Sequence, residues 1–202
     1  METRMIKAHP TTYAGTKFRS RLEARWAAFF DLLGWQWQYE PVDLNGWTPD
    51  FAIRCKDGPV YVEVKPIEWV GTNDDNNKQV KSRADLAKVF AYFKSVNEPR
   101  EVLVLGTAPS FITHKSDQYC TWGFLGSILW PTTQGDTPHV DTACLFKPKT
   151  GFDFCAYYGS YHFRIDGEYD GDHHLHGAGV DENMVEKLWR EASNRVQWKA
   201  AA

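Results

Sequence analysis

The stretch TPDFAIRCKDGPVYVEVKP, from Thr48 to Pro66, constrains the fold of this chain more than any other segment. Two runs with alternating apolar residues flank a Lys-Asp-Gly-Pro turn, and this pattern is typical of a β-hairpin. Side chains alternate between faces along each strand, so the apolar residues of both strands must share one face. The other face then carries three charged residues on neighbouring strands, namely Asp50, Glu63 and Lys65.

The register of this hairpin depends on its turn. A tight turn at Asp57-Gly58 would give a short hairpin, although the Pro59 that follows leaves the register open. The assignment of the two faces does not depend on the turn, because it follows from the hydrophobic pattern alone. The tight turn predicts these neighbours: Phe51 with Val64, Ile53 with Val62, and Asp50 opposite Lys65 and diagonal to Glu63.

The flanking segments predict the other elements of a mixed α/β core. Apolar residues at helical spacing predict a helix from Thr16, its N-cap, to Gly34, which ends it. The alternating segment WQWQYEP predicts a half-buried strand that Pro41 ends. Three further elements are predicted: a polar loop over Thr72–Lys78, a helix over Gln79–Val96, and a strand in EVLVLGTAP that is covered on both faces.

The pattern is less regular after Pro109, where aromatic and glycine-rich segments predict short strands and loops. Helical spacing returns in Asp181–Trp198, which predicts a final helix. The core order is helix, three strands, helix, strand, which predicts an α/β fold with a small mixed sheet flanked by helices. We divide the chain into a core over residues 1–108 and an aromatic-rich C-terminal elaboration over residues 109–202 that packs on it.

Composition and charge exclude several classes of protein. The N-terminal METRMIKAHP has no apolar run typical of a signal peptide, and no segment approaches the roughly 20 apolar residues that cross a bilayer. We therefore expect a cytoplasmic protein without a membrane segment. The net charge of −3 excludes a globally basic nucleic-acid binder, although Met1–Arg25 and Gln79–Arg100 are locally basic. The four cysteines lack paired spacing and favour free thiols: Cys55, Cys120, Cys144 and Cys155.

The charged face of the hairpin has two interpretations. Two carboxylates and a lysine on a covered sheet are unfavourable unless their charges are compensated. A divalent ion would compensate them, and carboxylate oxygens suit Mg²⁺ or Mn²⁺. The alternative is a solvated face whose carboxylates pair with Lys65 or Arg54. Glu23, at the flank of the first helix, could reach the same face or form a capping box with Ser20.

The residues Pro49 and Asp50, a dozen residues, and then Glu63-Val64-Lys65 resemble the signature of the PD-(D/E)XK nuclease superfamily. The predicted order of elements, over about residues 13 to 108, also resembles the restriction-endonuclease-like core of that superfamily. The resemblance implies a metal-dependent deoxyribonuclease that hydrolyses phosphodiester bonds. It is not a match to strict RecB-like exonucleases, which carry a glutamine and a tyrosine four residues apart, because Gln79 is followed at that spacing by Arg83.

The resemblance also implies roles for individual residues. Asp50, Glu63 and the backbone carbonyl of Val64 would bind one or two Mg²⁺ or Mn²⁺ ions, and Glu23 would reach the metal directly or through water. Lys65 would orient or activate the attacking water and stabilise the developing charge. Five basic residues near these elements would contact DNA phosphates or remain surface charges: Arg19, Arg25, Lys78, Lys81 and Arg83.

Two interpretations from other classes stay open. One is a nuclease-fold module that binds nucleic acid or a protein partner without turnover, which the intact Asp, Glu and Lys disfavour. The other is a zinc protein built on the C-terminal cysteines and the segment GDHHLHGAG (Gly171–Gly179), which lacks the usual paired ligands.

A homodimer and an origin in a phage or mobile element are compatible with the sequence. Five aromatic residues could stack on bases but more often pack in a core: Trp122, Trp130, Tyr157, Tyr158 and Tyr161.

Overall fold

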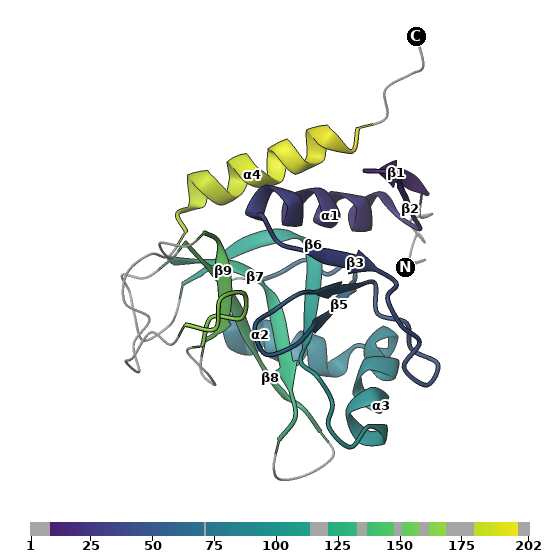
Figure 1. Cartoon of the computed structure of the whole chain (residues 1–202). Coiled ribbons are helices and arrows are strands. Elements are labelled where there is room, and N and C mark those ends of the chain that lie inside the picture. Colours follow the sequence, from purple (N-terminus) through teal and green to yellow (C-terminus); the bar gives the residue numbers. More distant parts are fainter. Residues whose placement is uncertain are drawn as a thin grey trace, which may run out of the picture.

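A seven-stranded mixed sheet organises the fold in the computed structural model (Figure 1). The structure describes residues 9–70, 72–113, 121–132, 137–147, 151–157, 162–168 and 180–197. The strands follow one another across the sheet in chain order, and all neighbours are antiparallel except the parallel third and fourth. They are β3 (Trp37–Tyr39), β4 (Phe51–Ile53), β5 (Val60–Val64), β6 (Val102–Thr113), β7 (Thr121–Trp130), β8 (His139–Phe146) and β9 (Asp153–Ala156).

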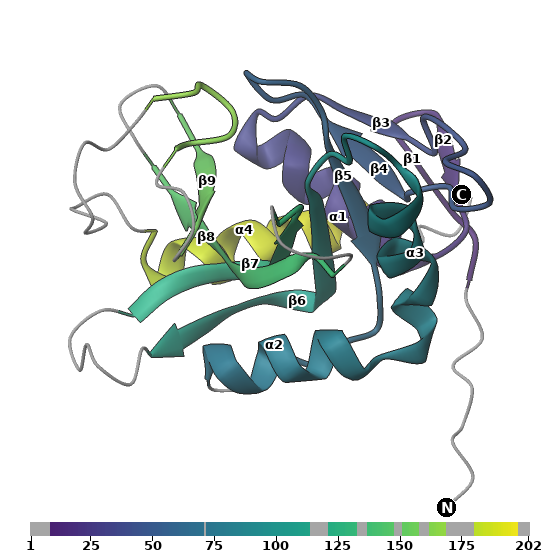
Figure 2. The same cartoon turned by 90° about the horizontal axis from the view of Figure 1, so that it is seen from below.

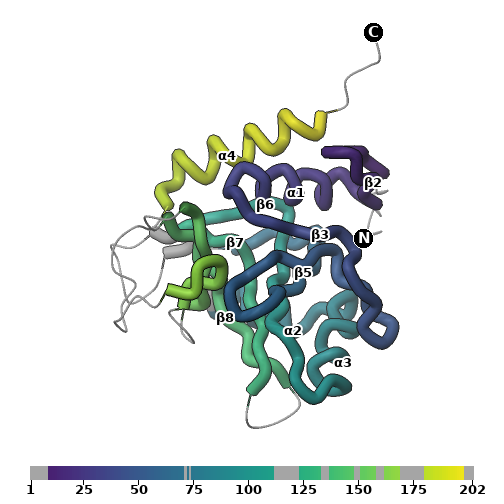
Figure 3. The backbone as a smooth tube through the Cα atoms, viewed as in Figure 1, coloured from purple at the N-terminus to yellow at the C-terminus, as the bar shows by residue number. Residues whose placement is uncertain are grey.

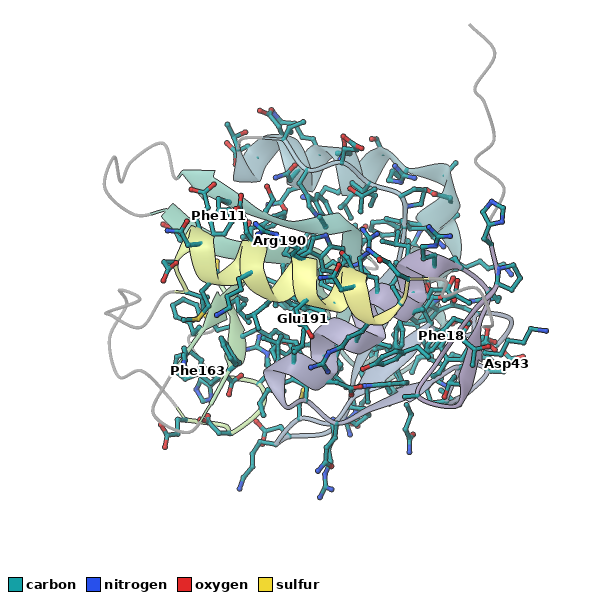
Figure 4. All side chains as sticks on the ribbon, turned by 90° about the horizontal axis from the view of Figure 1, so that it is seen from above. Phe18, Asp43, Phe111, Phe163, Arg190 and Glu191 are labelled. Carbon is teal, nitrogen blue, oxygen red and sulfur yellow. The ribbon has the colours of Figure 1, made fainter. Side chains whose placement is uncertain are left out.

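Helices cover both faces of this sheet. On one face lie α1 (Arg21–Leu33) and α4 (Glu182–Arg195), which run side by side (Figures 1 and 3). Figure 4 shows the charged side chains of Arg190 and Glu191 on the outer side of α4. On the other face lie α2 (Asn73–Ser82), the short helix η1 (Ala84–Leu86) and α3 (Ala87–Ser95), as Figure 2 shows from below.

The sheet separates two hydrophobic cores. Leu103 and Leu105 of β6 pack in the core under α1 and α4, whereas Val102 and Val104 pack in the core under α2 and α3. All four are fully buried. The prediction that EVLVLGTAP forms a strand covered on both faces is therefore confirmed, because apolar residues without polar alternation can only be buried on both sides.

The β4–β5 hairpin has the predicted faces but not the predicted register. The predicted apolar set of Phe51, Ile53, Val60, Val62 and Val64 joins the core under α1. The turn is centred on Lys56-Asp57 and not on Asp57-Gly58, because the Gly58 amide donates to the Cys55 carbonyl at 3.4 Å. This shift of the turn by one residue displaces the pairing by two residues. The observed pairs are Phe51–Val62, Ala52–Tyr61 and Ile53–Val60.

The first helix begins later than predicted. Thr16 is not its N-cap, because β2 (Thr16–Phe18) pairs with β1 (Thr11–Tyr13) in a separate two-stranded sheet. Phe18 still enters the core, but from a strand. The N-cap is Ser20, whose side chain accepts the backbone N–H of Glu23 at 3.1 Å. The predicted end is confirmed, since Gly34 terminates the helix with a φ of 75°.

The segment after the hairpin is helical where a loop was predicted. Thr72 caps α2, and buried Asn76 exchanges two hydrogen bonds with the backbone of Val70, which ties the start of this polar helix to the segment that precedes it. The single helix predicted over Gln79–Val96 is interrupted at Arg83, which has an extended backbone. The guanidinium of Arg83 donates two hydrogen bonds to Asp85, at 2.9 and 2.6 Å, and so stabilises the break.

The C-terminal half continues the same sheet. The predicted short strands are wrong, because β6, β7 and β8 are long and pair in order, so the sheet is larger than the small one predicted. The division proposed at residues 108 and 109 falls inside β6. The final helix is confirmed over Glu182–Arg195, with Val185 and Ala192 buried. Among the described helices, none is both long and apolar enough to cross a membrane.

Candidate active site

A polar pocket of about 370 Å³ lies where the start of α1, the end of β5 and the start of α3 meet. Figure 2 shows α3 next to β4 and β5 on this side of the molecule. The pocket brings together residues that lie far apart in the sequence but carry related chemistry. Six of the predicted site residues line it: Arg19, Glu23, Asp50, Glu63, Val64 and Lys65.

The hairpin register places the two central carboxylates side by side. Asp50 directly precedes β4, and Glu63 is the penultimate residue of β5. Because Phe51 pairs with Val62, the next position outward sets Asp50 across from Glu63, not across from Lys65 as predicted. Asp50 is 3% exposed and Glu63 is 7% exposed. Two carboxylates are thus buried at neighbouring positions, an arrangement that needs nearby positive charge.

Each carboxylate has one cationic partner and one neutral donor. Asp50 Oδ1 accepts from Arg19 Nη2 at 2.5 Å, and Asp50 Oδ2 accepts the Val64 amide at 2.7 Å. Glu63 Oε1 accepts from Lys65 Nζ at 2.5 Å, and Glu63 Oε2 accepts from Trp47 Nε1 at 2.9 Å. These contacts hold both carboxylates in defined orientations toward the pocket.

The pocket carries more negative charge than its cations offset. Burial, and next the charge of Glu63, raise the pKa of Asp50 from 3.8 to about 7. The charge of Glu23 raises it further, while the hydrogen bond from the Val64 amide acts in the opposite direction. Asp50 therefore holds a proton more tightly than an ordinary aspartate, and an additional cation beside it would favour the ionised form.

Glu23 combines the two roles that its sequence position suggested. Its Oε1 accepts from the hydroxyl of the N-cap Ser20 at 2.8 Å, so it takes part in capping α1. Its Oε2 accepts from the Tyr39 hydroxyl at 2.6 Å and from the Arg19 amide at 3.2 Å. Burial and the Glu23 hydrogen bond raise the pKa of Tyr39 to about 12, so its hydroxyl stays a donor. Glu23 is buried at the edge of the pocket and rigidly held.

Trp47 and Lys88 are two of the pocket residues that sequence reasoning missed; Gly46, Thr48, Asp85 and Val89 also line it. Trp47 lies in the connection between β3 and β4, is 4% exposed, and packs on Tyr92 with ring centroids 5.2 Å apart while it donates to Glu63. Lys88, near the start of α3, adds a second lysine to the pocket lining. Neither residue belongs to a motif, and only the packing of α3 against the hairpin brings them to the site.

The remaining predicted DNA contacts lie outside the pocket. Arg25 lies over the ring of Trp189 at 5.2 Å, within the packing of α1 against α4. Lys78 is 78% exposed, Lys81 is exposed in the last turn of α2, and Arg83 is engaged by Asp85. The structure thus separates Arg19, which contacts the central carboxylate, from the other four basic residues.

Four carboxylates line the pocket, and two of them, Asp50 and Glu63, lie side by side next to Val64. The Glu23 carboxylate is held by Ser20 and Tyr39, and that of Asp85 by Arg83. Within the described residues, no group of three or more His, Cys, Asp or Glu side chains is placed to hold a metal. The candidate set is therefore Asp50, Glu63 and the carbonyl of Val64, all hard oxygen donors of the kind that Mg²⁺ and Mn²⁺ prefer. The histidine-rich segment 171–179, Cys120, Tyr158, Tyr161 and the side chain of Trp122 lie outside the described residues.

The other cysteines and aromatic residues that were considered lie away from this pocket. Cys144 and Cys155 are fully buried beside Phe146 and Phe163, and Cys55 is half-buried. Burial raises the pKa of Cys55 to about 12, which disfavours the reactive thiolate. Trp130 stacks near His139 with ring centroids 4.6 Å apart.

We compared the chain with models of protein families, with curated proteins and with solved structures, and none of them matches. The function is therefore inferred from the chemistry and geometry of the pocket. Its distinguishing feature is the pair of buried carboxylates with a lysine beside one of them.

Proposed function

We propose that the chain is a metal-dependent deoxyribonuclease of the PD-(D/E)XK type. The observation that supports this most directly is the convergence of Asp50, Glu63 and Lys65 in one polar pocket at the end of the β4–β5 hairpin. Buried carboxylates at neighbouring positions lower the stability of a fold unless their charges are compensated. Their presence here therefore favours a functional site. Glu23 from α1 lines the same pocket, in keeping with the helix-borne acid of that superfamily.

The order of elements also supports this assignment. The chain runs from α1 through the antiparallel strands β3, β4 and β5 to α2 and α3, and then to β6, which is parallel to β5. We propose that this part forms a restriction-endonuclease-like core, and that β7, β8, β9 and α4 form an elaboration that extends its sheet. The candidate residues lie at the end of β5, next to the crossover to β6.

The residues of the pocket fit a hard divalent ion. Burial raises the pKa of Asp50 most, and the charges of Glu63 and Glu23 raise it further. Mg²⁺ or Mn²⁺ would neutralise that negative charge. Asp50, Glu63 and the Val64 carbonyl would hold the ion. When bound, such an ion supplies Lewis-acid stabilisation of the phosphate and lowers the pKa of water.

The chain's own side chains would share the remaining work. Lys65, held 2.5 Å from Glu63 Oε1, would orient the attacking water and donate toward the charge that develops on the phosphate. Trp47 would fix the second oxygen of Glu63 and limit its rotation. Arg19 and Lys88, at the rim of the pocket, would contact DNA phosphates.

A cleavage assay tests this proposal. Labelled single-stranded, duplex, flapped and branched DNAs are incubated with the protein in Mg²⁺, Mn²⁺ or EDTA. We expect metal-dependent cutting, and we expect Lys65→Ala to reduce the rate by roughly 10²- to 10³-fold, the usual effect of removing one charge-stabilising donor. Lys56→Ala is the matched control, because Lys56 is exposed at the opposite end of the same hairpin.

Two outcomes would contradict the proposal. Equal cutting by the wild-type and Lys65→Ala proteins would indicate a contaminating nuclease or a different site. No cutting of any DNA, with DNA binding retained, would favour the module that binds nucleic acid or a protein partner without turnover. The preferred substrate in a positive assay would define the subclass, and sedimentation with that DNA would test whether a homodimer forms.

A further inference from the structure

The Arg19 guanidinium occupies the position beside Asp50 that a bound metal ion would need. Its Nη2 lies 2.5 Å from Asp50 Oδ1, and its Nε lies 3.0 Å from Glu40 Oε1. The second Asp50 oxygen, Oδ2, is taken by the Val64 amide of the neighbouring strand. Oδ1 accepts no backbone hydrogen bond, so it is the oxygen better placed to bind a ligand from the pocket, and the Arg19 guanidinium is in contact with it.

The side chain of Arg19 can leave this position while its backbone stays in place. The Arg19 amide donates to Glu23 Oε2 at 3.2 Å and to the Tyr39 hydroxyl at 3.1 Å, immediately before the N-cap Ser20. In contrast, the Arg19 side chain is 58% exposed. Water can solvate the released guanidinium, whereas the buried Asp50 carboxylate needs another cation in its place.

We propose that Arg19 is the resident counter-ion of Asp50 in the metal-free protein, and that a divalent metal ion binds by displacing it. This inference rests on the proposed function, since it takes Asp50 to be a metal ligand. A metal ion within about 2.1 Å of Oδ1 and a guanidinium in contact with the same oxygen would place like charges next to each other. The two cations therefore compete for one oxygen.

Displacement need not leave Arg19 without a partner. Glu40, whose side chain is 37% exposed, contacts the guanidinium on the solvent side and can retain it at the rim. A guanidinium at that rim is placed to form charge-assisted hydrogen bonds to a DNA phosphate. Arg19 would thus change partner from a carboxylate to a phosphate as the site is loaded, which couples the binding of metal to the binding of DNA.

A metal titration without DNA tests the proposal. Mn²⁺ is added to the metal-free protein, and binding is followed by the loss of the free-ion electron paramagnetic resonance signal. We expect Arg19→Gln to bind Mn²⁺ about threefold to tenfold more tightly than the wild type, because the competing ion pair is gone. The matched control is Arg21→Gln, which removes the same charge from an exposed residue two positions along, and its affinity should stay within about twofold. Unchanged or weaker affinity of Arg19→Gln would overturn the proposal.

A third variant separates this proposal from the proposed function. Asp50→Asn should abolish Mn²⁺ binding if Asp50 is a ligand. If it does so while Arg19→Gln binds no more tightly than the wild type, the counter-ion role fails and the metal site stands. If Asp50→Asn binds Mn²⁺ like the wild type, the metal site itself is wrong. Thermal unfolding in EDTA shows which variants are folded, and Arg19→Lys replaces Arg19→Gln if the latter is not, with a smaller gain in affinity expected.

Discussion

Asp50 and Asp153 are two buried aspartates on the same sheet, and their partners differ in kind. Asp153, at the start of β9, is 1% exposed and accepts three backbone N–H groups, those of Phe154 at 2.7 Å, Ile165 at 2.8 Å and Asp166 at 3.0 Å. Asp50 accepts one hydrogen bond from a backbone N–H and one from the exposed Arg19, and the charges of Glu63 and Glu23 act on it.

The difference distinguishes a carboxylate whose donors are all backbone groups from one that lies in the proposed site. The donors to Asp153 are all backbone N–H groups, one in β9 and two in the segment 162–168. They cannot leave while these segments stay folded. Burial still raises the pKa of Asp153 to about 6, but its hydrogen bonds oppose the shift. The donors to Asp50 include a side chain that can be exchanged for another cation. We therefore expect changes at Asp153 to alter the stability of the fold, and changes at Asp50 to alter the binding of cations.

The largest expected effect on stability is that of Asp153→Ala. The substitution would remove the acceptor of three backbone N–H groups, of which that of Phe154 is buried and those of Ile165 and Asp166 are half-buried, and we expect the free energy of unfolding to fall by about 3 kcal/mol. Urea denaturation measures this loss. The control, Asp57→Ala in the exposed β4–β5 connection, should change stability by less than about 0.5 kcal/mol. A normal stability for Asp153→Ala, or a loss of Mn²⁺ affinity in the folded variant, would remove the contrast with Asp50.

A smaller effect, of opposite sign, is expected for Asp50→Asn in EDTA. The folded-state pKa of about 7 lies above the ordinary 3.8, so the folded protein binds this proton more tightly than the unfolded chain. The wild type should therefore lose stability as the pH rises between about 4 and 7, and the asparagine variant should lack that loss. The full shift corresponds to roughly 4 kcal/mol, and we expect about half of it, about 2 kcal/mol above pH 7, because the asparagine also loses the ion pair with Arg19; the two proteins should be equally stable near pH 4.

Denaturation at several pH values checks this prediction. Asp57→Asn is the control for the change in formal charge, because Asp57 is exposed. A destabilised Asp50→Asn protein at pH 8 would mean that the ion pair with Arg19 outweighs the cost of burying the carboxylate, which would make Asp50 a structural residue like Asp153.

The smallest effect is expected for Trp47→Phe, which removes the hydrogen bond to Glu63 Oε2. We expect a stability loss of about 1 kcal/mol and a severalfold weaker Mn²⁺ affinity, because Glu63 becomes free to rotate. The matched control is Trp35→Phe, since Trp35 is equally buried and donates to the Phe152 carbonyl at 2.8 Å, away from the pocket. Equal Mn²⁺ affinities of the two variants would show that Trp47 only fills space.

The residues of the candidate site could be predicted from the sequence more fully than the side chains that form hydrogen bonds with them. The motif and the parity of the hairpin sufficed to select Asp50, Glu63 and Lys65, because alternation along a strand is a local property. The partners of these residues could not be predicted in the same way. Asp50 pairs with Arg19, and Glu63 is fixed by Trp47, through contacts between segments that no local period relates.

The fold shows the same division between local pattern and tertiary contact. The double burial of β6, the apolar side of α4 and the faces of β4 and β5 follow from the spacing of apolar residues, because burying them dominates the stability of these elements. The hairpin register, the start of α1 and the polar helix α2 depend on local hydrogen bonds that the spacing of apolar residues does not encode. The Gly58 amide closes the β4–β5 turn on Cys55, β1 pairs with β2 ahead of α1, and Asn76 bonds to the backbone of Val70. Only the tertiary structure decided the contacts between distant segments, such as the parallel pairing of β5 with β6 and the hydrogen bond from the Lys56 amide to the Arg164 carbonyl, because these partners meet only in the folded chain.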